Sequence, residues 1–91
     1  MSPSSDALVV ERSIVLPAHL HARPAGQLVQ VAAGFGAAIE IRFEGKTASA
    51  RSILALMSLG ATAGTTVTVA ATGPDAEAAA AAASDVLESA R

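Results

Sequence analysis

One short segment carries the residues best suited to chemistry, Leu20-His21-Ala22-Arg23-Pro24-Ala25. It places an imidazole close to a guanidinium and a proline. Proline fits the first turn of a helix, where its missing N–H group costs nothing, so the pattern predicts a helix that begins beside His21. The free N–H groups and the partial positive charge of a helix N-terminus bind anions. A histidine at such a place is suited to carrying a phosphoryl group.

The requirements of a transient phosphoryl carrier match this segment. Imidazole is a usable nucleophile at neutral pH, since the unperturbed pKa of histidine is about 6.5. A loop at a helix start is open to both donor and recipient for in-line transfer. Backbone N–H groups and a planar guanidinium compensate phosphoryl oxygens. We therefore predict His21 as the phosphoryl acceptor and Arg23 as its stabilising cation, with Ala22 and Pro24 forming the anion-binding helix start.

Other chemistry is poorly supported by the residue types. A loop histidine and a first-turn arginine can simply be solvated side chains. His19 and His21 lack a third ligand at a spacing suited to zinc. The sequence has no cysteine, and its acidic residues are scattered, so neither thiolate chemistry nor a catalytic triad can be argued. We expect no metal and no cofactor.

Length and composition limit the remaining possibilities. The 91 residues predict a single domain spanning 1–91, with a flexible polar tail at 1–6. A net charge of −2 argues against nucleic acid as a partner. Residues 1–6 are polar and lack the basic-then-apolar order of a signal peptide, and no apolar run reaches the roughly 20 residues of a membrane span. Together with the missing cysteines, this predicts a cytoplasmic protein that does not insert into membranes.

The hydrophobic pattern predicts alternating strands and helices. Segments that are rich in β-branched residues, or in which apolar and polar residues alternate strictly, indicate strands. Segments with apolar residues at helical spacing, or rich in alanine, indicate helices. The expected strands are 8–16, 38–43, 47–50 and 65–70, and the expected helices run from Pro24 to about Gly34, from Ile53 to Leu59 with Ser52 as N-cap, and over 75–90. The order βαββαβα predicts an α+β fold, an open-faced β-sandwich of four mostly antiparallel strands with three helices on one face.

Two motifs resemble one protein family. The segment His21-Ala22-Arg23-Pro24-Ala25 closely resembles the active-site signature of HPr, the histidine-containing phosphocarrier of the bacterial phosphoenolpyruvate:sugar phosphotransferase system. Gly45 to Gly60 resembles the second signature of that family, around its regulatory serine. The element order also agrees with the family fold, and the resemblance covers residues 8–90.

The resemblance implies roles for matching residues. His21 corresponds to the histidine phosphorylated on Nδ1, and Arg23 to the arginine that steadies the phosphoryl group. The donor would be phosphorylated Enzyme I, charged from phosphoenolpyruvate, and the recipient a IIA domain of a sugar permease. Such a protein is a recycled phosphorylated intermediate and not an enzyme with its own turnover. A monomer is expected.

The second signature implies regulation and docking. Ser52 matches the serine that a dedicated kinase phosphorylates in many Gram-positive relatives, although its spacing also fits a plain N-cap worth about 1 kcal/mol. Ile53, Leu54 and Met57 match the apolar patch that docks partners in the family. The alternative is that they belong to the core, and their spacing on a short helix predicts that at least one of them is buried.

The sequence departs from the family pattern at the active-site loop and on the first helix. The family usually has glycine before the Leu-His pair, where this chain has His19, and a second imidazole there could compete for the phosphoryl group or assist it. The exposed positions of the first helix are usually basic, but here they are Gln27, Gln30 and Ala33. Arg23 and Arg51 are the basic residues expected near the site, so electrostatic steering toward an acidic Enzyme I should be weak.

Three other functions remain open at this point. The nearest is the nitrogen-related paralogue of the same fold, which serves a regulatory phosphorelay and shares the His-Ala-Arg-Pro signature. A co-repressor-like relative would instead dock on a transcription regulator through Ser52. A plain α+β binding module would carry the motif incidentally, and would be unaffected by replacement of His21.

Overall fold

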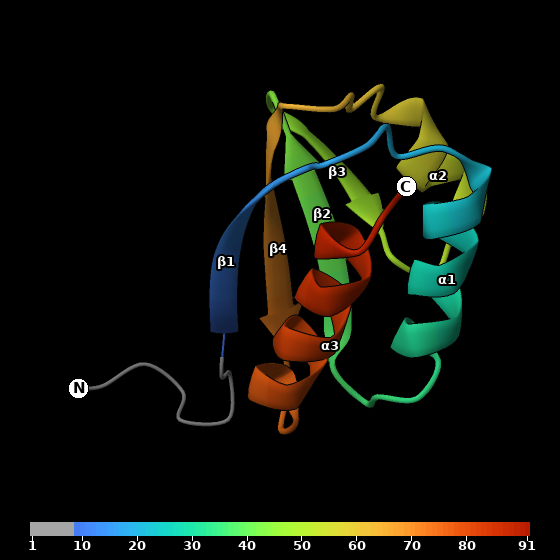
Figure 1. Ribbon diagram of the computed structural model, residues 1–91. Helices are drawn as coiled ribbons and strands as arrows, with labels where there is room; N and C mark the ends of the chain where they lie inside the picture. Colours follow the sequence, from blue (N-terminus) through green and yellow to red (C-terminus); the bar gives the residue numbers. More distant parts are fainter. Residues whose placement is uncertain (1–8) are drawn as a thin grey trace.

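A computed structural model describes residues 9–91 and shows a four-stranded sheet covered by helices on one face (Figure 1). The predicted tail, residues 1–6, lies outside the described residues. The elements follow the expected order. They are β1 (Val9–Val15), α1 (Ala22–Ala32), β2 (Ala38–Phe43), β3 (Lys46–Ser49), α2 (Ile53–Ser58), β4 (Thr66–Thr72) and α3 (Ala76–Glu88).

The sheet confirms the predicted fold class. Its strand order is β1-β4-β2-β3, and every neighbouring pair is antiparallel. The strand β4 lies in the centre and continues beyond the predicted end at residue 70, because Thr72 pairs with both Val9 and Ala38. All three helices pack on the same side of the sheet. No helix within residues 9–91 has the length and apolar character needed to span a membrane.

The core lies between the sheet and the helices. Alternation along the strands turns one set of side chains inward, and helical spacing does the same for one face of each helix. The fully buried side chains include Leu16, Leu28, Ile41, Leu56, Val67, Val69 and Leu87. The inner face of α3 is made mostly of alanine, and its small side chains let the helix lie close to β1 and β4. This packing determines the position of the residues that follow α3, up to Arg91.

One buried position on α3 was not anticipated from the sequence. Ser84 is only 3% exposed, and its hydroxyl has no hydrogen-bond partner in the structure. A buried unsatisfied hydroxyl is costly, and alanine is the better helix former. We therefore expect Ser84→Ala to raise the free energy of unfolding by about 1 kcal/mol, measured by urea denaturation. Ala83→Ser, which adds a hydroxyl to the same core, should lower it; a Ser84→Ala variant less stable than wild type would contradict this reading.

The entry to α3 is held by Asp75. Its carboxylate accepts hydrogen bonds from the N–H groups of Gly36 at 2.9 Å and Ala37 at 2.7 Å. Nearby, Gly73 has a φ of +139°, and an added Cβ would meet Ala37 Cα at 3.0 Å, so the close approach requires glycine. These contacts fix the start of α3 against the chain that enters β2.

Asp75 should make stability depend on acidic pH. The bond from Gly36 N–H holds the pKa of Asp75 below its ordinary value of 3.8; desolvation opposes this effect, and the bond from Ala37 N–H adds to it. The unfolded chain therefore binds a proton more readily, so stability is gained as pH rises between the two pKa values. The contribution of Asp75 is complete above about pH 5 and is lost as pH falls through 3.8 toward the folded-state pKa.

We expect Asp75→Asn to lower the Tm at neutral pH, with the deficit shrinking toward about pH 3. Thermal unfolding followed by circular dichroism over this range measures the effect. Asp85→Asn, on the exposed face of the same helix, is the matched control. A deficit that stayed constant from neutral pH to acid would show that the charge of Asp75 is not its cause.

Candidate functional site

The predicted helix start beside His21 is confirmed. His21 is the N-cap of α1, with extended backbone angles of φ −93° and ψ −169°. Its carbonyl accepts the first helical hydrogen bond, from Ala25 N–H at 3.1 Å. Its side-chain Nδ1 accepts from Arg23 N–H at 3.3 Å, a long and therefore weak bond. The imidazole thus lies against the N–H group of Arg23 at the start of the helix.

The two ring nitrogens of His21 have different partners. Because Nδ1 faces an N–H donor, its lone pair must point to the helix start, and the proton of the neutral ring lies on Nε2. Nε2 is 3.0 Å from the backbone oxygen of Arg91, to which it can donate. Hydrogen bonding at one nitrogen sets which tautomer is present. The arrangement therefore leaves Nδ1 as the unprotonated nitrogen, weakly occupied and directed at an anion-binding helix end.

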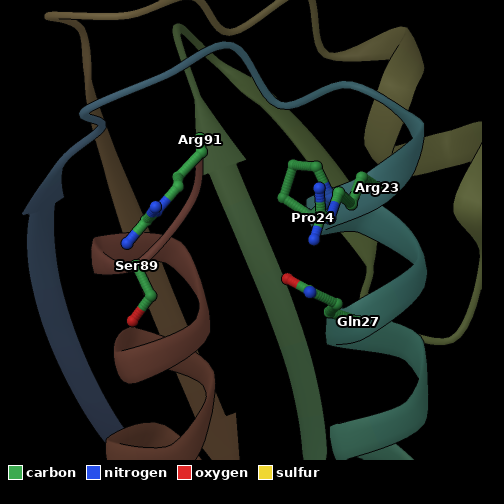
Figure 2. A pocket seen from close by; sticks show the side chains of 5 residues that line it. All are labelled: Arg23, Pro24, Gln27, Ser89 and Arg91. Carbon is green, nitrogen blue, oxygen red and sulfur yellow. The ribbon is translucent and has the colours of Figure 1, made fainter.

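A small hollow of about 90 Å³ opens next to the start of α1. Figure 2 shows its walls: Arg23, Pro24 and Gln27 come from α1, and Ser89 and Arg91 from the chain after α3. Within residues 9–91 the ion pairs involve Arg12 and Arg42, and no Asp or Glu side chain pairs with Arg23 or Arg91. Two arginine side chains therefore line a hollow that has room for a small anion.

Two residues of this hollow, Ser89 and Arg91, were missed in the sequence, and Gln27 was expected only as an exposed position of the first helix. Ser89 and Arg91 lie about 70 positions from His21 in the chain, and they border the hollow only because α3 packs along α1. No local pattern could reveal that contact. Gln27 follows Arg23 by four residues, so its position on the same side of α1 as Arg23 could have been anticipated from helical spacing.

The predicted docking patch lies on α2, and all three of its side chains are exposed. Ile53 is 41%, Leu54 78% and Met57 41% exposed. The expectation that at least one of them is buried was wrong. Leu56 takes the inward position of this short helix, so the other three large side chains turn outward. The structure therefore gives α2 an apolar surface that its own fold does not cover, and α2 packs directly against α1.

Ser52 and Arg51, which precede α2, have separate structural roles. Ser52 is half-buried and caps the helix, as predicted: its hydroxyl accepts from Ala55 N–H at 3.1 Å. Arg51 was expected near His21, and this was wrong. Its guanidinium donates to the Phe35 carbonyl at 3.1 Å, just beyond the C-terminal end of α1. With a rise of about 1.5 Å per residue, this end lies roughly 16 Å along the helix from His21.

His19 is placed differently from His21. Its Nδ1 accepts from Ala63 N–H at 3.0 Å, in the loop between α2 and β4. Its carbonyl oxygen accepts from His21 N–H at 2.9 Å. The two imidazoles therefore have different partners, and within residues 9–91 no group of three or more potential ligands is arranged to hold a metal ion.

Comparison with known proteins points to one family. The family model described as "PTS HPr component phosphorylation site" matches residues 10–89. The phosphocarrier protein HPr of Vibrio cholerae is 48% identical over 58 residues, which cover 64% of this chain and 68% of that protein. The multiphosphoryl transfer protein of Xanthomonas campestris is 41% identical over 78 residues, or 85% of this chain, but the match spans only 9% of that longer protein.

Solved structures agree with this match. The crystal structure of the phosphocarrier protein HPr of Bacillus anthracis superposes with a TM-score of 0.80 at 37% identity, covering 87% of this chain and 96% of that one. The HPr-C-His structure from Thermoanaerobacter tengcongensis gives 0.76 at 39% identity, with coverage of 90% and 92%. The similarity thus extends over both the signature around His21 and the α2 segment.

Proposed function

This chain belongs to the PTS HPr family, and from that premise we propose that it carries a phosphoryl group on Nδ1 of His21. The group would come from phosphorylated Enzyme I, which phosphoenolpyruvate charges, and would pass to IIA domains of sugar permeases. The observation that carries the proposal is the place of His21 Nδ1, which accepts from Arg23 N–H at the N-terminus of α1. This hydrogen bond favours the tautomer in which Nδ1 is the unprotonated nitrogen.

The transfer step follows from this geometry. The Nδ1 lone pair attacks phosphorus in line, a bond from Nδ1 to phosphorus forms, and the bond from phosphorus to the donor breaks. The Nε2 proton stays in place, so the ring gains positive character, which the Arg91 backbone oxygen at 3.0 Å stabilises. The long bond from Arg23 N–H to Nδ1 is exchanged for bonds from the helix start to phosphoryl oxygens. Transfer to the recipient reverses these steps.

Arg23 supplies the nearest cationic side chain on α1. It is exposed and borders the hollow, so its guanidinium can reach phosphoryl oxygens and withdraw again. Ala22 presents only a methyl group at the helix start and leaves the approach to Nδ1 open. Pro24 is buried and has no N–H group, so it shapes the first turn without competing for the anion. Weak, exposed stabilisation suits a group that must leave.

The exposed patch on α2 supports the proposed docking role. Enzyme I and the IIA domains would each cover Ile53, Leu54 and Met57 while the reacting group meets His21. Exposed contiguous apolar side chains are typical of partner surfaces. Since Arg51 is engaged at the far end of α1, we expect apolar contact to contribute more to docking than charge attraction.

The direct test is phosphorylation of the wild-type chain. We would incubate it with phosphoenolpyruvate and a sugar-system Enzyme I, and in parallel with the first enzyme of the nitrogen-related branch. Intact-protein mass should show one acid-labile phosphoryl group, formed faster with the sugar-system enzyme. Phosphorylation by the nitrogen-branch enzyme alone would assign the chain to the regulatory phosphorelay, and no phosphorylation by either would overturn the proposal.

Regulation at Ser52 is a further part of the proposal. Its hydroxyl caps α2, so a phosphate there would replace the cap and add negative charge beside the docking patch. A serine kinase and a transcription regulator that reads the phosphoserine would be the additional partners. Incubation with ATP and such a kinase should give an acid-stable phosphate that Ser52→Ala abolishes. We further propose that the protein acts in the cytoplasm as a monomer, although one solved relative is described as an HPr dimer.

A further inference from the structure

His19 lies where the active-site loop meets the loop that follows α2. Backbone hydrogen bonds join the two loops at several points: Leu16 N–H to Thr65 O at 2.9 Å, Gly64 N–H to Leu16 O at 2.8 Å, and Leu20 N–H to Ala61 O at 3.0 Å. One side-chain bond adds to them, from Ala63 N–H to His19 Nδ1 at 3.0 Å. The imidazole thus bridges segments 44 positions apart in the chain.

The main chain of His19 also holds the phosphoryl acceptor. Its carbonyl accepts from His21 N–H at 2.9 Å, and the intervening Leu20 is buried at 5% exposure. A tight turn therefore runs from His19 to His21, anchored in the core at its centre. Through its side chain His19 fixes the far loop, and through its carbonyl it fixes the N-cap residue of α1.

The hydrogen bond to Ala63 also determines which nitrogen of His19 is free. Since Nδ1 accepts an N–H proton, the neutral ring carries its own proton on Nε2. The Nδ1 lone pair of His19 is engaged at 3.0 Å, whereas that of His21 meets its donor only at 3.3 Å. His19 in this state offers no free nitrogen lone pair to a phosphoryl donor.

We propose that His19 is a positioning residue for the phosphoryl transfer at His21, and not a second acceptor. Its bond to Ala63 joins the His21 loop to the loop that follows α2. The helix α2 carries the exposed side chains Ile53, Leu54 and Met57. The bond thereby sets the distance between the docking patch and the reacting nitrogen. This role of His19 rests on the proposed function, in which His21 alone accepts the phosphoryl group.

Two variants separate the hydrogen bond from the side-chain volume. His19→Leu fills similar space without an acceptor, and His19→Asn places an amide oxygen where Nδ1 was. We expect His19→Leu to lower kcat for phosphorylation by Enzyme I about five- to tenfold, the equivalent of one lost hydrogen bond, with KM unchanged within about twofold. His19→Asn should restore kcat to within about twofold of wild type. We expect kcat to fall while KM stays the same because His19→Leu leaves the docking patch intact and disturbs only the alignment of His21 with the phosphoryl donor.

A spectroscopic readout tests the bond itself. In nitrogen-15-labelled wild-type protein, a scalar coupling between the Ala63 amide nitrogen and His19 Nδ1 should be detectable across the hydrogen bond, and it should vanish in His19→Leu. Thermal unfolding of both variants shows whether they fold. Equal kcat for wild type and a folded His19→Leu would overturn the positioning role, as would a His19→Asn variant no better than His19→Leu.

The outcomes distinguish this inference from the proposed function. A wild-type chain that no Enzyme I phosphorylates would overturn the proposed function, and the positioning role with it. A phosphorylated wild type with an unaffected His19→Leu would overturn the positioning role alone. A phosphoryl group on folded His21→Ala protein that disappears when His19 is also replaced would identify His19 as an acceptor and contradict the proposal.

Discussion

Replacement of His21 by alanine is expected to abolish phosphorylation by Enzyme I, a loss of more than about 10³-fold in rate. The variant loses the nucleophilic Nδ1, and no other described imidazole has its lone pair at a helix start, since His19 Nδ1 is bonded to Ala63. Intact-protein mass after incubation with phosphoenolpyruvate and Enzyme I measures the result. The wild-type chain should gain one acid-labile phosphoryl group, and His21→Ala none.

A second variant removes an ambiguity in this experiment. His21 is also the N-cap of α1, so His21→Ala should lose about 1 kcal/mol of folding stability along with the nucleophile. Asparagine is a good N-cap, and its side-chain oxygen can accept from Arg23 N–H. We expect His21→Asn to unfold near the wild-type temperature and still remain unphosphorylated. Phosphorylation of His21→Asn would show that another residue accepts the group.

The start of α1 was predicted from the sequence only in part. Pro24 predicted a helix beside His21, but α1 begins at Ala22, so the proline is third in the helix rather than first. The difference is small in energy because the first three N–H groups of a helix are all free. That His21 itself caps the helix was not predicted, since Ser, Thr, Asp and Asn are the usual N-caps.

The strands followed the sequence well where alternation was strict. The bounds of β2, Ala38–Phe43, agree with the prediction because one of its faces is buried and the other exposed. The end of β4 was placed short, because Ala70 and Ala71 alternate weakly and Thr72 is held by pairing on both sides. Pairing between strands, which local pattern does not contain, decided that boundary.

The least predictable parts of the site depend on packing between distant segments. Arg91 and Ser89 border the hollow because α3 crosses the sheet beside α1, and nothing near them in sequence indicates this. Arg51 lies within the second signature, yet its side chain turns to the Phe35 carbonyl. A long and flexible side chain such as that of Arg51 can bond to any acceptor that the fold brings near it. Its residue type alone therefore could not predict where its guanidinium lies.

The exposure of Leu54 leads to the second large effect that we expect. Replacing it with glutamate should lower kcat/KM for phosphorylation by about 10- to 100-fold, chiefly through a higher KM. Leu54 is 78% exposed, so the variant loses little folding stability, but a charge at the centre of an apolar contact must be desolvated against the partner. Steady-state kinetics with phosphoenolpyruvate, a catalytic amount of Enzyme I and this chain as the varied substrate measures the change.

The matched control is Val15→Glu. Val15 is 64% exposed on the sheet face opposite the helices, because its neighbour Ile14 points into the core. Both variants exchange an exposed apolar side chain for a carboxylate and make the net charge more negative by the same amount. A general electrostatic repulsion from an acidic Enzyme I would therefore slow both equally, whereas a docking patch on α2 predicts that only Leu54→Glu is impaired. Equal kcat/KM values for the two variants would place the docking surface elsewhere.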